Sequence, residues 1–161
     1  FKYFLEVFNP NVDTGIAPEA VPDYINDCIA RCLAGVTKAD RPQFLKIVYN
    51  GPKALEALAS YDPSLVVGVL GGGGGTNRDT FELLSQAERY GGRVALFGRK
   101  INNAESQLHI VSLMRQVADG AVTPEEAVRA YHGELQKLNL KPVRALADDI
   151  LVTEAPLKHA A

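Results

Sequence analysis

Two charged residues interrupt apolar, strand-like runs in the first third of the chain. The run "YFLEVF" carries Glu6 as its one charge, and "FLKIVY" carries Lys46. Because side chains alternate along a strand, each charge shares a sheet face with the apolar residues two positions away. Burying a lone ion costs several kcal/mol, so we expect the two charges to meet on neighbouring strands.

A lysine paired with a carboxylate inside a sheet has two interpretations. The pair can be structural, or each side chain can reach solvent at its strand end. Alternatively, Lys46 is a nucleophile: a desolvated lysine loses part of its proton affinity, and the neutral amine attacks a carbonyl to form a Schiff base. Glu6 would then be the nearby group that moves protons. Residue spacing leaves both interpretations open.

A run of glycines, "GGGGGT" at residues 71–76, lies between an apolar segment and the start of an expected helix. Consecutive glycines let backbone N–H groups converge on an oxygen-rich ligand, and the helix N-terminus adds a positive end. A Walker loop is excluded, because Gly75 is followed by Thr76 and Asn77. We expect a phosphate here, with Arg99 after the next strand adding bidentate hydrogen bonds. Its neighbour Lys100 is expected to be solvated.

The chain alternates β-like and helical segments. Runs typical of strands lie at residues 3–8, 44–49, 65–70 and 94–97, and amphipathic helical stretches follow each of them. Such alternation predicts βα units and a parallel sheet. The residues with unusual chemistry lie in the loops after the strands, which is the edge where α/β proteins bind ligands.

Two α/β architectures are compatible with this order. One is a small, doubly wound open sheet, and the other is half of an eight-stranded βα barrel. Because a strand begins almost at Phe1, we expect a TIM (βα)8 barrel of which this chain supplies about four βα units, strands five to eight, and a C-terminal helix. Residues 1–140 would form this C-terminal half, and residues 141–161 a surface or disordered tail.

Composition restricts the partners that we expect. The 161 residues carry a net charge of −2 without a block of like charges. The sequence therefore does not indicate a basic surface for nucleic acid or for an anionic membrane. No apolar run approaches the roughly 18 residues that span a bilayer. Cys28 and Cys32 share a helical face, which favours buried, reduced thiols over a metal site. We expect a cytoplasmic protein with a small phosphorylated substrate.

Four segments resemble a known family. They are "FLEVF", "FLKIVYNGP", "VVGVLGGGGGT" and "ALFGRKIN", and they follow one another as strands five to eight do in class I, Schiff-base aldolases on βα barrels. The likeness is to the group of archaeal-type fructose-bisphosphate, tagatose-bisphosphate, sulfofructose-phosphate and deoxyribose-phosphate aldolases. It covers about residues 1–120. The glycine loop lacks the serine that commonly precedes the family's glycine pair.

The resemblance implies a function and site residues. Lys46 would form the Schiff base, and Glu6 matches the acidic residue on the fifth strand of the tagatose-bisphosphate branch. The substrate phosphate would be bound by Gly72, Gly73, Gly98 and Arg99. The protein would then be a lyase that makes or breaks a carbon–carbon bond in a phosphorylated sugar or keto compound, without a metal ion or organic cofactor.

Two other functions remain open. In an NADP-dependent oxidoreductase, the glycine run would bind the nucleotide and Arg99 its 2′-phosphate. In a non-catalytic sugar-phosphate-binding barrel, Glu6 and Lys46 would merely be paired. The sequence leaves a homo-oligomer open, and it fixes neither the sugar nor the direction of the reaction.

Overall fold

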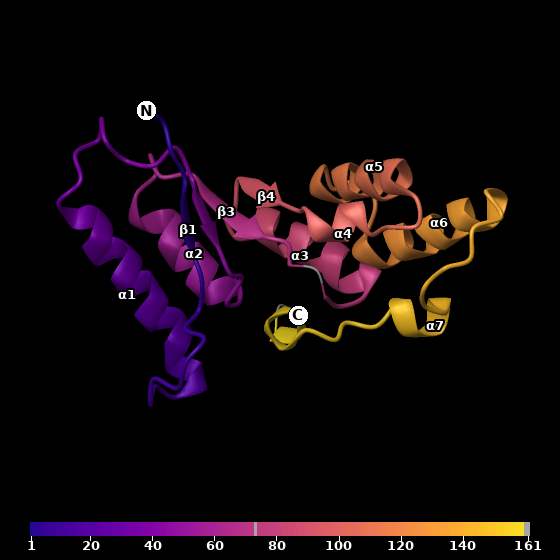
Figure 1. Cartoon of the computed structure of the whole chain (residues 1–161), viewed down its shortest axis with the longest axis horizontal. Helices are drawn as coiled ribbons and strands as arrows, with labels where there is room; N and C mark the ends of the chain where they lie inside the picture. Colours follow the sequence, from indigo (N-terminus) through magenta and orange to yellow (C-terminus); the bar gives the residue numbers. More distant parts are fainter. Residues whose placement is uncertain (73, 160–161) are drawn as a thin grey trace.

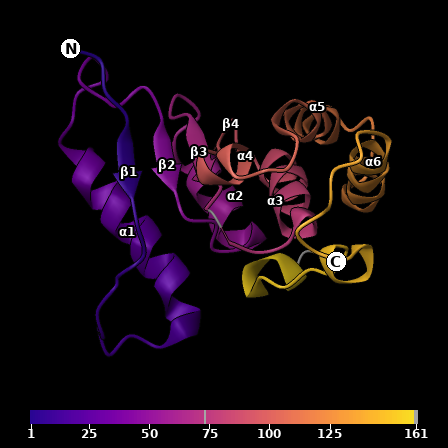
Figure 2. The same ribbon diagram turned by 45° about the vertical axis from the view of Figure 1, so that its right-hand side comes forward.

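Strands and helices alternate along the chain as predicted. The structure is a computed structural model that describes residues 1–72 and 74–159. Its strands are β1 (Leu5–Val7), β2 (Leu45–Ile47), β3 (Val67–Leu70) and β4 (Val94–Leu96). They form one parallel sheet in the order β1-β2-β3-β4, and Figure 2 shows them side by side. The expected α/β class with a parallel sheet is confirmed.

Helical segments follow every strand. They are η1 (Pro18–Ala20), α1 (Val21–Ala34), α2 (Pro52–Tyr61), α3 (Asn77–Arg89), α4 (Arg99–Asn102), α5 (Gln107–Ala118), α6 (Pro124–Lys137), α7 (Leu146–Asp149) and η2 (Ala155–His159). The start of α6 is closed by a capping box: the Thr123 hydroxyl accepts a hydrogen bond from the Glu126 N–H, and the Glu126 carboxylate accepts one from the Thr123 N–H.

The first core lies between one face of the sheet and helices α1 and α2. Leu45 and Ile47 of β2 are 0% and 4% exposed and pack in this core with Ile29 of α1 and Leu55 of α2. Alternate residues of a strand point to opposite faces. Lys46, between the two buried residues, therefore projects from the face that α1 and α2 do not cover.

A second core joins α3, α5 and α6. Phe81, Ile110 and Tyr131, one from each of these helices, are all fully buried in it. Phe97, just after β4, packs against both cores. Figure 1 shows α5 and α6 on the side of α3 away from the strands. The helical region therefore extends the molecule sideways from the sheet.

The C-terminal segment differs from the expected tail. After α6 the chain turns back along α3, as Figure 1 shows. Asp149 is 2% exposed, and Leu157 is 7% exposed and belongs to the first core. The Gln86 side chain on α3 donates a hydrogen bond to the Leu157 carbonyl at 2.9 Å. The prediction of a disordered tail is wrong for residues 146–157, because buried contacts hold this segment, although many of its side chains lie at the surface as expected. Ala160 and Ala161 lie outside the described residues.

Two further sequence predictions concern α1 and membrane spans. Cys28 is partly buried and Cys32 is exposed, so the expectation of two buried thiols is wrong for Cys32. The hydrophobic face of α1 is centred on Ile25, Ile29 and Leu33 instead.

Among the described residues, no helix has the length and apolar character that crossing a membrane requires.

Candidate functional site

Glu6 and Lys46 meet on the sheet face that α1 and α2 leave uncovered. They occupy paired positions of β1 and β2, and the Lys46 Nζ lies 2.7 Å from the Glu6 Oε1. The Lys46 side chain is 24% exposed and the Glu6 side chain 29%. The predicted contact between the two charges is confirmed. Phe4 and Phe44 lie two residues before Glu6 and Lys46 on the same face, and their rings stack with centroids 5.0 Å apart.

The next strand carries a glycine beside this ion pair. Gly68 of β3 lies opposite Lys46 in the register, and Val94 of β4 lies opposite Gly68. A Cβ on Gly68 would come within 2.8 Å of the Leu45 carbonyl oxygen, which explains the glycine structurally. In this row of the sheet no side chain stands between Lys46 and Val94. The amine therefore has a carboxylate on one side and a position without a side chain on the other.

Steric contacts and backbone angles within the protein explain several glycines of the loop. A Cβ on Gly71 would lie 2.0 Å from the Phe97 ring, and Gly72 and Gly75 have φ angles of 55° and 71°. Side chains are disfavoured at such positive φ angles. A Cβ on Gly72 or on Gly98 would meet no other atom within 4 Å, so both predicted phosphate positions border open space. Gly73 lies outside the described residues.

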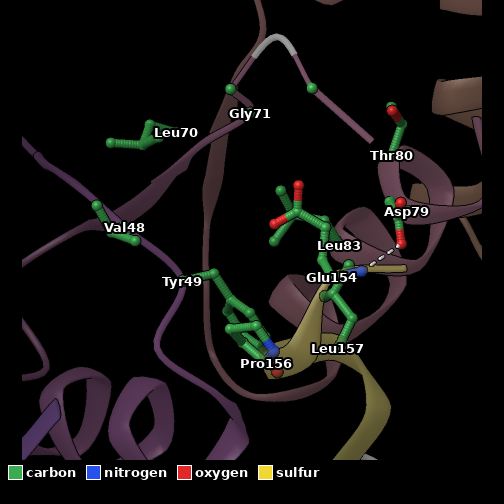
Figure 3. A pocket seen from close by; sticks show the side chains of 12 residues that line it. Val48, Tyr49, Leu70, Gly71, Asp79, Thr80, Leu83, Glu154, Pro156 and Leu157 are labelled. Carbon is green, nitrogen blue, oxygen red and sulfur yellow. Dashed lines mark hydrogen bonds between the residues drawn. The ribbon is translucent and has the colours of Figure 1, made fainter. Parts of the chain in front are cut away.

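The loop is divided between two cavities, although we expected one cavity shared with Arg99. The first has a volume of about 110 Å³, and Gly71, Gly72 and Glu154 are among its lining residues. Figure 3 shows Glu154 in this cavity below the loop. The second has a volume of about 150 Å³ and is lined by Gly75 and Arg99. The expectation holds at Gly75 and fails at Gly71 and Gly72.

Charge distinguishes the two cavities. The charged residues that line the first are Asp79 and Glu154, both acidic, so an anion is disfavoured there. The second is lined by the basic residues Arg99, Lys100 and Arg144 together with two carboxylates. The second cavity is therefore the better place for a phosphate.

The N-terminus of α3 is occupied by carboxylates of the chain itself. The Asn77 backbone N–H and side-chain amide donate to the two oxygens of Asp149, at 2.8 and 2.7 Å. The Thr76 N–H donates to the Asp79 carboxylate at 2.8 Å. We expected this helix end to help hold a phosphate. That expectation is wrong, since these groups already receive the negative charge that a helix N-terminus favours.

Hydrogen bonds tie Asp79 to the C-terminal segment as well. Burial alone would raise the pKa of Asp79, but hydrogen bonds from the Thr153 hydroxyl and from the backbone N–H groups of Thr76, Thr153 and Glu154 outweigh it. The net result is a pKa below the ordinary aspartate value. Asp79 is thus held as a carboxylate that joins the start of α3 to residues 153–154.

Lys100 is buried, although the sequence suggested a solvated side chain. It is 9% exposed, and its Nζ donates to the backbone carbonyls of Gly75 and Thr76 at 3.2 and 3.1 Å. The short helix α4 turns this side chain away from solvent and toward the loop. Lys100 therefore fixes the end of the glycine loop, a role for which its position beside Arg99 gave no signal.

Residue spacing also missed a buried cluster around Asp149. The His132 Nε2 lies 2.9 Å from the Asp149 Oδ2, and the His132 side chain is 11% exposed. Asp149 thus receives hydrogen bonds from α3 and lies against α6, which joins these helices to α7. The residues come from positions 77, 132 and 149, and no local pattern marks such a distant set.

No protein-family model and no curated protein matches this chain. The resemblance to Schiff-base aldolases therefore rests on the four sequence segments alone. Within residues 1–72 and 74–159, no group of three or more His, Cys, Asp or Glu side chains is arranged to hold a metal ion.

Proposed function

We propose that this protein is a Schiff-base aldolase that acts on a phosphorylated sugar or keto compound. The observation that carries the proposal is the contact of 2.7 Å between Lys46 and Glu6 on the sheet face opposite α1 and α2. A paired amine and carboxylate in the middle of two strands are unusual, because the strands of a parallel sheet are normally apolar on both faces. They are the two groups that imine chemistry requires.

The proposed architecture is the C-terminal half of a (βα)8 barrel. Sequential order of four parallel strands, with α1 and α2 packed against the same face, is the arrangement found in βα barrels. In a doubly wound sheet the strand order reverses at a switch point, and no reversal occurs among these strands. Under this proposal Glu6 and Lys46 point into the barrel, below the loops that follow the strands.

The proposed reaction begins at the Lys46 amine. Glu6, or a water molecule on it, accepts a proton from Nζ, and the nitrogen then attacks the substrate carbonyl carbon. Loss of water gives the iminium ion. Cleavage of the bond between the α and β carbons sends its electron pair toward the iminium nitrogen and leaves an enamine, while a base takes the proton of the β-hydroxyl group, which becomes the carbonyl of the released aldehyde. Protonation of the resulting enamine and hydrolysis return the free amine.

The same ion pair supports a second candidate, a non-catalytic barrel that binds sugar phosphates and uses Glu6 and Lys46 only for structure. The structure does not favour an NADP-dependent oxidoreductase. A dinucleotide would place its pyrophosphate at the start of α3, where Asp79 and Asp149 already accept the backbone N–H groups.

Borohydride trapping separates the two candidates. The full chain is incubated with dihydroxyacetone phosphate and sodium borohydride, and the modified peptide is identified by mass spectrometry. We expect a secondary amine at Lys46 and none in Lys46→Met. Lys53→Met, which removes an exposed lysine at the start of α2, is the matched control and should be trapped normally. No adduct at Lys46, or equal modification of other lysines, would refute the aldolase.

A further inference from the structure

The second cavity is built where three separate parts of the chain meet. Its walls come from the end of the glycine loop at Gly75, from α4 with Arg99, and from the C-terminal segment with Arg144. Its volume of about 150 Å³ is several times the roughly 30 Å³ that one water molecule takes in the liquid. A tetrahedral anion with some of its hydration water can therefore enter.

The carboxylates of this cavity already have donors. Glu105 accepts hydrogen bonds from the Val143 N–H at 2.7 Å and from the Tyr131 hydroxyl at 3.0 Å. Asp149 accepts two from Asn77. Neither carboxylate forms an ion pair with an arginine of the cavity in the described part of the chain.

The basic side chains of this cavity differ from the carboxylates in their hydrogen-bond partners. Lys100 donates to the carbonyls of Gly75 and Thr76, whereas among the described residues no hydrogen bond or ion pair involves the Arg99 or Arg144 side chain. Burial lowers the pKa of Lys100; Asp149 opposes this shift, and the Arg144 guanidinium adds to it. Arg144 is thus close enough to disfavour a neighbouring positive charge. An anion in the cavity would relieve that repulsion.

The position of Arg144 is held by the fold. The hydrogen bond from the Val143 N–H fixes the preceding residue to Glu105, at the connection between α4 and α5. Asp149, five residues later, is anchored to α3 through Asn77. The short segment between these two anchors therefore places Arg144 beside the cavity, which it lines.

We propose that this cavity binds a phosphoryl group between the guanidinium groups of Arg99 and Arg144. Guanidinium groups suit this ligand because their fork of N–H donors matches two oxygens of a phosphate. Arg144, on a segment that resembled a free tail, becomes a substrate-binding residue. The identification of the phosphoryl group as that of the substrate rests on the proposed aldolase function, and the binding of phosphate itself does not.

Calorimetric titration with inorganic phosphate tests the site. We expect Arg144→Gln and Arg99→Gln each to weaken binding about tenfold or more, the effect of losing hydrogen bonds to a charged group. Arg144→Lys keeps the charge without the fork and should lie between the wild type and Arg144→Gln. The control is Arg115→Gln, which removes an exposed arginine on α5 that is paired with Asp119. It should bind phosphate as the wild type does, and circular dichroism verifies that each variant is folded.

A second measurement separates this site from the imine chemistry. Arg144→Gln should require about tenfold more dihydroxyacetone phosphate for half-maximal borohydride trapping, whereas Arg115→Gln should require the wild-type amount. If Lys46 forms no adduct while phosphate binding depends on Arg144, the aldolase proposal fails and the anion site stands. Equal phosphate affinity in Arg144→Gln and Arg115→Gln, or no phosphate binding by the wild type, overturns the site.

Discussion

Replacing Asp149 by alanine should release the C-terminal segment from the start of α3. The Asp149 side chain is almost fully buried and accepts the backbone N–H and the side-chain amide of Asn77. It also lies 2.9 Å from His132. Alanine removes all three contacts at once. Because Asn77 is only 8% exposed, water cannot easily replace the carboxylate as the acceptor of its two donors.

The magnitude follows from the groups that lose their partners. A buried donor without an acceptor costs about 1–3 kcal/mol, and Asn77 would contribute two such donors. The His132 side chain is 11% exposed and can reach water more readily, so it adds less. We expect the free energy of unfolding to fall by about 2–5 kcal/mol, a large part of the roughly 5–15 kcal/mol of a typical domain.

The assay is urea unfolding followed by circular dichroism, combined with hydrogen exchange at the amide of Asn77. Exchange there should accelerate, because Asp149 accepts that N–H in the wild type. Asp148→Ala is the matched control, since it removes an exposed aspartate from the same turn and should change stability by about 0.5 kcal/mol or less. If Asp149→Ala and Asp148→Ala unfold at the same urea concentration, the hydrogen bonds do not anchor the segment and our reasoning is wrong.

Three further predictions use other contacts. Thr153→Val removes a hydrogen bond that lowers the pKa of Asp79, so it should reduce stability by about 1 kcal/mol at pH 7. A carboxyl group with a lowered pKa contributes stability above its ordinary value of 3.8 and loses it as the pH falls through the folded value. In acid-dependent urea unfolding, the difference from the wild type should therefore shrink below pH 3.8, and a difference that grows would contradict this. Gly71→Ala should cost about 1–3 kcal/mol because its Cβ would meet the Phe97 ring, whereas Gly74→Ala, with open space around it, should be nearly neutral in thermal unfolding. Equal melting temperatures would exclude the clash. Glu6→Gln should slow aldol turnover about 10²- to 10⁴-fold while borohydride trapping partly persists, and unchanged turnover would remove Glu6 from proton transfer.

The parts of the fold that follow short-range patterns could be predicted from the sequence. Period-two runs and helical periodicity identified the four strands and the helices that follow them. The contact between Glu6 and Lys46 could also be predicted, because each residue is the one charge in an apolar strand and an unpaired ion is costly to bury. Strands that follow each other through βα connections are commonly neighbours, which brings these two charges together.

The contacts of the C-terminal segment could not be predicted in this way. Asp149 lies 72 residues from Asn77, and Thr153 lies 74 residues from Asp79. Nothing in "ALADDI" marks Asp149 as buried, because its burial depends on donors at the start of α3. Lys100 was misjudged for a similar reason: its long side chain reaches carbonyls that are 24 and 25 residues away. Local composition does not contain this information.

These long-range contacts change the interpretation of the glycine run as a phosphate-binding loop. The C-terminal end of the run is fixed from inside the protein, since Lys100 donates to the carbonyls of Gly75 and Thr76 while Asp149 accepts from the next residue, Asn77. The carboxylates of this region are used to build the fold, and the arginines beside them have no such partners among the described residues. The charge left over for a ligand is therefore positive. That balance favours a phosphate at Arg99 and Arg144, in a cavity separate from the acidic one that Glu154 lines.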